Sequence, residues 1–195
     1  MRPDLAALLD ELEKFGQAND RAISERPRRM LNITRDTGEF LAVLVAATRA
    51  RRILEIGTSN GYSTLWLAWA AKELGGRVTT VELSEYKREL AARTFERSGL
   101  ADTITQVQGD AGGILAWGET GAYDLVFLDS ERGEYVDWWP DLKRALRPGG
   151  LLVVDNATSH AAEMEPFMAL VRADGAFTTC LATVGNGEFM ATRAS

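Results

Sequence analysis

The chain has 195 residues, 46% of them hydrophobic, with a net charge of -6 and an isoelectric point near 5.0. This length fits one domain over residues 1–195, and the acidic balance argues against a nucleic-acid backbone as the main partner. No apolar run approaches the ~18 residues that a membrane span needs, so we expect no membrane association. The acids among the first leucines are not typical of a signal peptide, and the single cysteine, Cys180, cannot form an internal disulfide, so we expect a cytoplasmic setting.

Residues 1–50 precede the first predicted strand and have helical patterns, including residues 38–50. Leucines 5, 8, 9 and 12 form an amphipathic stripe that could pack on the domain or on a second subunit. We expect this segment to cover one edge of a sheet or to form a lid, and the protein to be a homodimer. The one basic run, Arg26, Arg28 and Arg29, is expected to be solvated.

From residue 52 onward, short apolar segments alternate with helical ones. The predicted strands are Arg52–Gly57, Arg77–Leu83, Thr103–Gln108, Tyr123–Asp129 and Leu151–Asp155. The predicted helices are Thr64–Leu74, Glu85–Ser98 and Tyr135–Leu146, and the sequence Pro148-Gly149-Gly150 is expected to break the chain before the fifth strand. Such alternation predicts an α/β fold, a doubly wound parallel sheet with helices on both faces. Phe177–Val184 and Glu188–Arg193 add an antiparallel closing hairpin, for seven strands in all.

The loop after the first strand has the composition of a ligand-binding turn. Gly57 and Gly61 let the backbone turn sharply beside a ligand, and the helix that begins near Ser63 points its N–H groups at the same place. A dinucleotide fingerprint needs glycine where this chain has Ser59 and Tyr62, which disfavours NAD or FAD. The loop therefore indicates a different ligand.

Two further strand ends support a nucleoside cofactor. Glu82 ends the second strand about 20 residues after Gly61, the distance at which an acid reaches ribose hydroxyls. Gly109, Asp110 and Ala111 follow the third strand, where small residues leave room for a flat base.

The segment Glu55-Ile56-Gly57-x-x-x-Gly61-Tyr62-Ser63 resembles the first motif of class I S-adenosylmethionine (SAM) methyltransferases with a Rossmann-like fold, particularly the catechol O-methyltransferase-like family. The resemblance implies that Gly57 and Ser63 hold the methionine end, Glu82 the ribose, and Asp110 with Ala111 the adenine edge. Glu55 would support the loop and the cofactor's amino group. The full set of expected cofactor contacts is Glu55, Gly57, Ser59, Gly61, Tyr62, Ser63, Glu82, Leu83, Gly109, Asp110, Ala111 and Asp129.

Acids also end the fourth and fifth strands. If these strands are neighbours, Asp129, Asp155 and Asn156 converge, and such all-oxygen ligands suit Mg²⁺. Strand-end acids can also simply cap helices or face solvent. The family resemblance matches these three residues to metal ligands.

The expected general base is missing. The family pattern Asp-x-x-Lys-x-x-Tyr uses its lysine as the base, whereas this chain has Arg132 at that position. Arginine stays protonated and cannot accept a proton, although Arg132 could stabilise a phenolate. The proton would then go to Glu131, to water beside the metal, or to His160, the only histidine, at the predicted start of a helix.

The sequence thus predicts a SAM-dependent O-methyltransferase that acts on a small hydroxylated acceptor, catechol-like and aromatic, with the help of a divalent metal. A metal-independent methyltransferase of the same fold and a non-catalytic SAM-binding module are the alternatives. Glu188, in the hairpin, could reach a substrate hydroxyl or be solvated on an edge strand.

Overall fold

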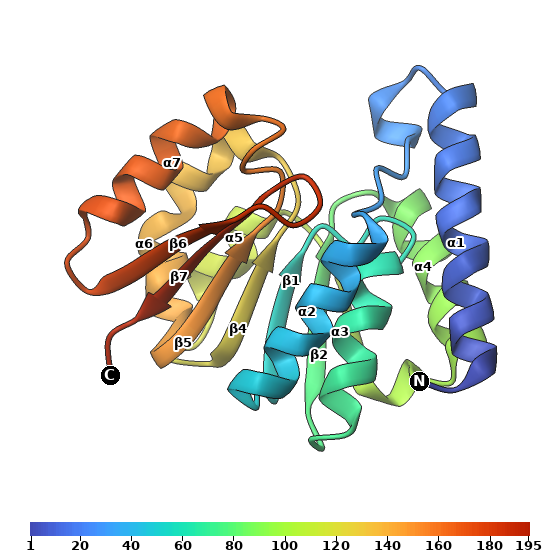
Figure 1. Cartoon of the computed structure of the whole chain (residues 1–195), viewed down its shortest axis with the longest axis horizontal. Coiled ribbons are helices and arrows are strands. Elements are labelled where there is room, and N and C mark those ends of the chain that lie inside the picture. Colours follow the sequence, from blue (N-terminus) through green and yellow to red (C-terminus); the bar gives the residue numbers. More distant parts are fainter.

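The computed structural model describes residues 1–195. It has three layers, in which one sheet lies between two layers of helices (Figure 1). The strands are β1 (Arg52–Ile56), β2 (Arg77–Glu82), β3 (Ile104–Gln108), β4 (Tyr123–Leu128), β5 (Leu146–Val154), β6 (Phe177–Ala182) and β7 (Glu188–Arg193). Their order across the sheet is β3-β2-β1-β4-β5-β7-β6. Only β7 runs against the other strands. The predicted seven-stranded, mostly parallel sheet with a closing hairpin is therefore confirmed.

Helices cover both faces of the sheet. One face carries α1 (Pro3–Ala22), α2 (Arg35–Thr48), α3 (Tyr62–Lys72) and α4 (Glu85–Ser98). The other carries α5 (Ala111–Trp117), α6 (Tyr135–Ala145) and α7 (Ala161–Ala173). Three short 3₁₀ turns complete the chain: η1 (Arg26–Arg28), η2 (Ala101–Thr103) and η3 (Arg132–Glu134). The central strands carry apolar side chains on both faces. A hydrophobic core therefore lies on each side of them.

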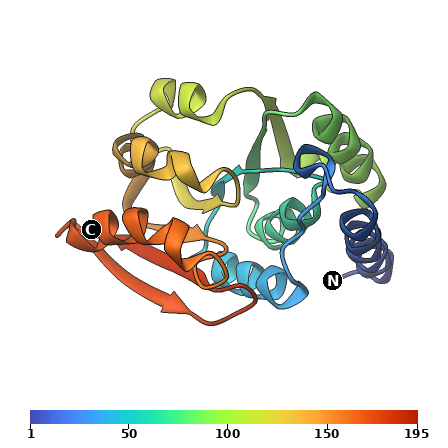
Figure 2. The same ribbon diagram turned by 90° about the horizontal axis from the view of Figure 1, so that it is seen from above.

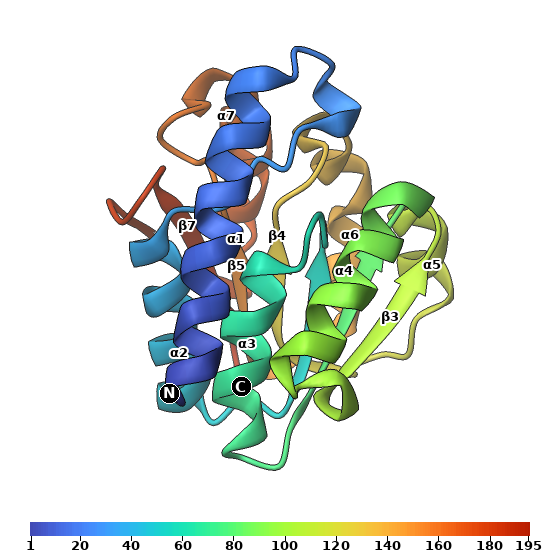
Figure 3. The same ribbon diagram turned by 90° about the vertical axis from the view of Figure 1, so that its right-hand side faces the viewer.

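The N-terminal helices pack on the domain itself. The stripe Leu5, Leu8, Leu9 and Leu12 is buried in the same core as α2 and α3. Helix α1 and the closing hairpin lie at opposite ends of the molecule (Figure 2). The chain leaves α1 through η1 at the end of the molecule to which the parallel strands point (Figure 3). Residues 23–34 are thereby brought over the carboxyl ends of the strands.

One sequence expectation about β5 is wrong. The sequence Pro148-Gly149-Gly150 was expected to precede the strand, but the strand begins at Leu146 and includes it. Leu146 pairs with Tyr123 and Leu151 with Leu125, so the intervening residues bulge out of the ladder. Gly149 has a φ of +71° within this bulge, a conformation that glycine adopts without strain.

Candidate active site

A cavity of about 1080 Å³ lies at the carboxyl ends of the parallel strands. Residues that follow β1, β2, β3, β4 and β5 all line it, which confirms the predicted shared rim. From the predicted site these are Gly57, Ser59, Tyr62, Ser63, Glu82, Leu83, Gly109, Asp110, Ala111, Asp129, Glu131, Arg132, Asp155, Asn156 and His160. Glu55 and Gly61 are the two predicted site residues that do not line it.

The loop after β1 is fastened to its neighbours by short contacts. Gly57 has a φ of +105°, and its N–H donates to the carbonyl oxygen of Val81 at 3.0 Å. A Cβ at Gly57 would overlap the carbonyl oxygen of Asp129, so only glycine lets β1 and β4 end this close together. The cofactor loop and the predicted metal ligand Asp129 are therefore adjacent.

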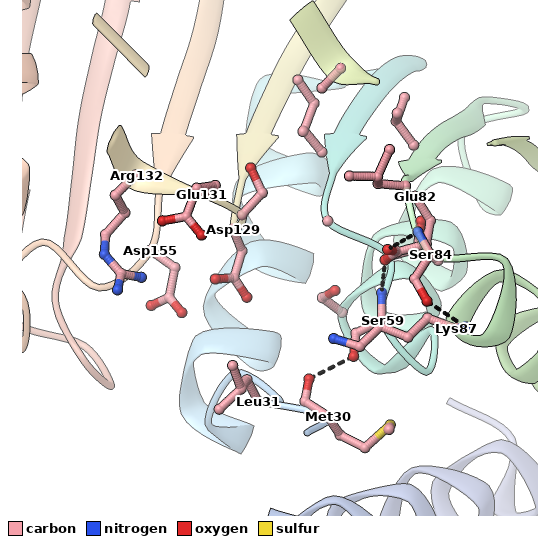
Figure 4. Close-up of a pocket in the computed structure, with 18 of the residues that line it drawn as sticks. Met30, Leu31, Ser59, Glu82, Ser84, Lys87, Asp129, Glu131, Arg132 and Asp155 are labelled. Atoms are coloured by element: carbon pink, nitrogen blue, oxygen red, sulfur yellow. Dashed lines mark hydrogen bonds between the residues drawn. The ribbon is translucent and has the colours of Figure 1, made fainter. Parts of the chain in front are cut away.

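Glu82 is nearly buried and holds two backbone amides. Its Oε2 accepts from Ser59 N and its Oε1 from Ser84 N, both at 2.9 Å (Figure 4). Each carboxylate oxygen has a second lone pair, so the side chain can still accept from ribose hydroxyls. Ser84 also caps α4, with its hydroxyl accepting from Lys87 N.

Glu55 lies behind the loop rather than in the cavity. Its side chain is fully buried and accepts hydrogen bonds from the hydroxyls of Ser63, Thr64 and Thr80. Burial raises the pKa of Glu55 to about 7. The expected support of the loop therefore agrees with the structure, but a contact with the cofactor's amino group has no counterpart in this geometry.

Next to Glu82, the cavity wall has the features of a base-binding slot. Leu83 is 70% exposed, a large apolar side chain on the cavity wall. Asp110 caps α5 by accepting from Gly113 N at 2.7 Å, and Ala111 follows it. Trp138 also lines this cavity. These groups suit a flat, uncharged ring.

Sequence reasoning missed the wall formed by residues between α1 and α2. Met30 and Leu31 donate their N–H groups to the Asp20 carboxylate at 2.7 and 2.8 Å, and Ser59 Oγ donates to Met30 O at 2.6 Å. Arg26 and Arg29 line the cavity, Arg26 exposed as expected and Arg29 half-buried. The signal available in the sequence was a basic run with a proline between two helices, which does not indicate where the segment lies. Other missed cavity residues are Lys87, Ser130, Glu163 and Asn186.

The predicted metal ligands do come together. Asn156 Nδ2 donates to Asp129 Oδ1 at 3.2 Å and to Asp155 Oδ2 at 2.8 Å. Burial, and then the Asp155 charge, raises the pKa of Asp129, and burial raises the pKa of Asp155. Two buried carboxylates this close repel each other unless a proton or a cation lies between them.

Glu188 is not solvated, because β7 is an interior strand. Its side chain is fully buried, and Thr37 Oγ1 donates to its Oε1 at 3.0 Å. Burial, and then the Asp155 charge, raises the pKa of Glu188, so we expect a neutral acid there. The expectation of a solvated edge-strand acid is therefore wrong, and Glu188 does not line the cavity.

The remaining catalytic candidates surround the acid pair. Arg132 is 9% exposed, and its Nε donates to Glu163 Oε2 at 2.8 Å, while Figure 4 shows its guanidinium beside Asp155. Glu131 is exposed and pairs with Arg26 at 3.6 Å. His160 immediately precedes α7 and makes no capping hydrogen bond with its side chain, and its Nδ1 lies 3.0 Å from Ser159 Oγ. The charge of Arg132 opposes the rise in the pKa of Asp129 and Asp155.

No helix combines the length and apolar character needed to cross a membrane. No three His, Cys, Asp or Glu side chains group closely enough to hold a metal ion, so a site here depends on Asn156 as the third ligand.

Comparisons with known proteins give the family. The family model described as O-methyltransferase matches residues 4–192. A catechol O-methyltransferase from Mycobacterium tuberculosis is 38% identical over 162 residues, 79% of this chain and 71% of that protein. Another, from Niastella koreensis, is 33% identical over 153 residues, 77% of this chain and 65% of that protein. The chain thus spans about two thirds of the length of these relatives.

Solved structures of O-methyltransferases are also similar to this chain. An O-methyltransferase from Bacillus cereus in complex with SAH has a TM-score of 0.79 and 26% identity, covering 96% of this chain and 90% of that one. An O-methyltransferase from Streptomyces achromogenes in complex with SAM has the same TM-score and identity, covering 100% and 91%. The chain belongs to the O-methyltransferase family of class I SAM-dependent methyltransferases, as its first-loop motif indicated.

Proposed function

We propose that the protein transfers a methyl group from SAM to a hydroxyl of a small catechol-like acceptor, assisted by a divalent cation. The observation that carries the proposal is the contact of Asn156 with both Asp129 and Asp155, in the same cavity as Glu82 and the first loop. A methyl donor bound at the loop and a hydroxyl bound at the acid pair would then be neighbours. Holding the two reactants at contact distance supplies much of the rate of such a displacement.

The residues at the acid pair suit a hard cation. Asp129, Asp155 and Asn156 offer only oxygen ligands once the Asn156 amide turns its oxygen inward. A bound Mg²⁺ would lower the pKa of a coordinated hydroxyl and fix its position. The repulsion between the two buried carboxylates would also be relieved.

His160 is the general base that the geometry favours. Glu131 is exposed and engaged with Arg26, and Glu163 with Arg132, whereas His160 lines the cavity with no carboxylate partner and with its Nδ1 3.0 Å from Ser159 Oγ. Arg132 would stabilise the phenolate as the proton leaves. The attacking oxygen then takes the methyl group, and the C–S electron pair stays on sulfur.

The direct test is methylation of catechol with SAM, measured with and without EDTA and added Mg²⁺. We expect Asp129→Ala to abolish metal-dependent turnover while SAH affinity stays within about tenfold, because Glu82 and the loop remain intact. Asp137→Ala, on the exposed face of α6, is the matched control and should behave as the wild type. Full activity of Asp129→Ala would refute the role of the acid pair.

A metal-independent reaction is the second candidate, and Arg132 is the observation that favours it. Its guanidinium is a fixed positive charge beside the acid pair and could stabilise the phenolate without an ion. Turnover that survives thorough EDTA treatment and is lost in Arg132→Met would support this candidate over the metal-assisted one.

A further inference from the structure

Lys87 is a cation in the cavity that has no partner. It lies in the first turn of α4, is half-buried, and lines the cavity on the same side as Glu82 and Ser59 (Figure 4). Its ammonium forms no hydrogen bond, and no carboxylate lies within 4.0 Å of it. Three arginines also line the cavity. Arg26 pairs with Glu131 and Arg132 with Glu163, whereas Arg29 has no ion pair.

The position is costly for a lysine in the free protein. Burial lowers the pKa of Lys87, although the charges of Glu82, Asp129 and Asp20 oppose this effect from a distance. The N-terminus of α4 carries a partial positive charge that repels a cation in its first turn. Desolvation, the helix end and the lack of a contact partner all disfavour the ammonium until something in the cavity accepts its hydrogen bonds.

The position of Glu82 indicates that the acceptor for the Lys87 ammonium is a ribose hydroxyl. Its two oxygens each accept one backbone amide, from Ser59 and Ser84, which fixes the carboxylate and leaves it further lone pairs facing the cavity. A ribose hydroxyl that donates to this carboxylate still has lone pairs of its own. An ammonium close by can donate to them, so that one hydroxyl connects a cation and an anion that do not touch in the free protein.

We propose that Lys87 is a further cofactor-binding residue, whose ammonium donates a hydrogen bond to a ribose hydroxyl oxygen of the nucleoside held by Glu82. The proposal rests on the proposed function only in requiring that SAM or SAH binds this cavity. Lys87 then contributes to binding through the ribose, and neither through the amino-acid end of the cofactor nor through the acceptor.

The test is calorimetric titration of the whole protein with SAH and with 5′-methylthioadenosine, which keeps the ribose but lacks the amino-acid carboxylate. Lys87→Met keeps the aliphatic stem and removes the charge, and we expect it to weaken both ligands about tenfold or more, as for a lost hydrogen bond to a charged group. Lys87→Arg should recover part of the loss. Lys14→Met, an exposed lysine on α1, is the matched control and should bind both ligands as the wild type does.

Thermal unfolding of the ligand-free variants separates binding from structure. Because Lys87 is unfavourably placed in the free protein, Lys87→Met should unfold at the same temperature as the wild type or higher, while its affinity falls. A lower unfolding temperature with unchanged affinity would overturn the proposal, as would weakening of SAH without weakening of 5′-methylthioadenosine. If the wild type binds neither ligand, the proposed function fails; if wild type and Lys87→Met bind both equally, only the role of Lys87 fails.

Discussion

The close approach between the first loop and β4 can be tested by replacing Gly57 with alanine. The added Cβ would overlap the carbonyl oxygen of Asp129 and lie 2.8 Å from its carbon, at a residue whose φ is +105°. A positive φ costs a residue with a Cβ about 1–2 kcal/mol, and overpacking against backbone costs about 1–3 kcal/mol more. We therefore expect Gly57→Ala to lower the free energy of unfolding by about 2–5 kcal/mol, measured by urea denaturation, and to lower the Tm by about 5–15 °C.

Gly75→Ala is the matched control for this prediction. Gly75 also has a positive φ, +69°, but a Cβ there would meet nothing within 4 Å. Its substitution should cost only the backbone part, about 1–2 kcal/mol. The difference between the two variants then measures the steric contact between the cofactor loop and the end of β4. Equal losses would refute the reasoning, because they would show that Gly57 and Asp129 are not in close contact.

Three further predictions concern single charged residues. Glu82→Ala should weaken SAH binding by about 1–3 kcal/mol in calorimetry, since the ribose loses a charged acceptor, and unchanged affinity would contradict that role. Arg132→Lys introduces an amine that can lose its proton, so the rate with catechol should rise tenfold or more while that with 4-nitrocatechol, which ionises readily, stays constant. Burial raises the pKa of Glu55 from 4.5 to about 7, so its contribution to stability is complete below pH 4.5 and is lost as the pH rises through 7. Glu55→Gln should flatten this decline by about 2–3 kcal/mol in urea denaturation at pH 4.5 to 8, and an unchanged slope would show that Glu55 titrates normally.

Local signals in the sequence predicted individual elements well. Helix α4 matches its predicted bounds, because Ser84 caps its start and Gly99, with a φ of +67°, ends it. The strand ends were equally clear, and parallel strands put their carboxyl ends on one rim. For this reason the sequence alone predicts Gly57, Glu82 and Asp129 at one edge of the sheet.

The same local signals do not predict where elements far apart in the sequence lie relative to one another. The hairpin was correctly predicted, but no residue in it shows that β7 lies between β5 and β6, which is what buries Glu188 against Thr37. The turn between α1 and α2 likewise has no periodicity that would place it over the strand ends. Its position depends on the Asp20 carboxylate and on Ser59, partners that are 10 and 29 residues away from Met30.

Arg132 links the charge of the site to its chemistry. A lysine at this position could become neutral and take the acceptor proton, whereas a guanidinium held by Glu163 stays charged and stays in place. The same charge would repel a metal ion at Asp129 and Asp155 and attract a phenolate, so it would weaken the proposed cation site while favouring an ionised acceptor. The proton would then have to go to another group, and we propose His160, which lines the same cavity. With arginine at this position, we expect proton acceptance and charge stabilisation to fall to two different side chains.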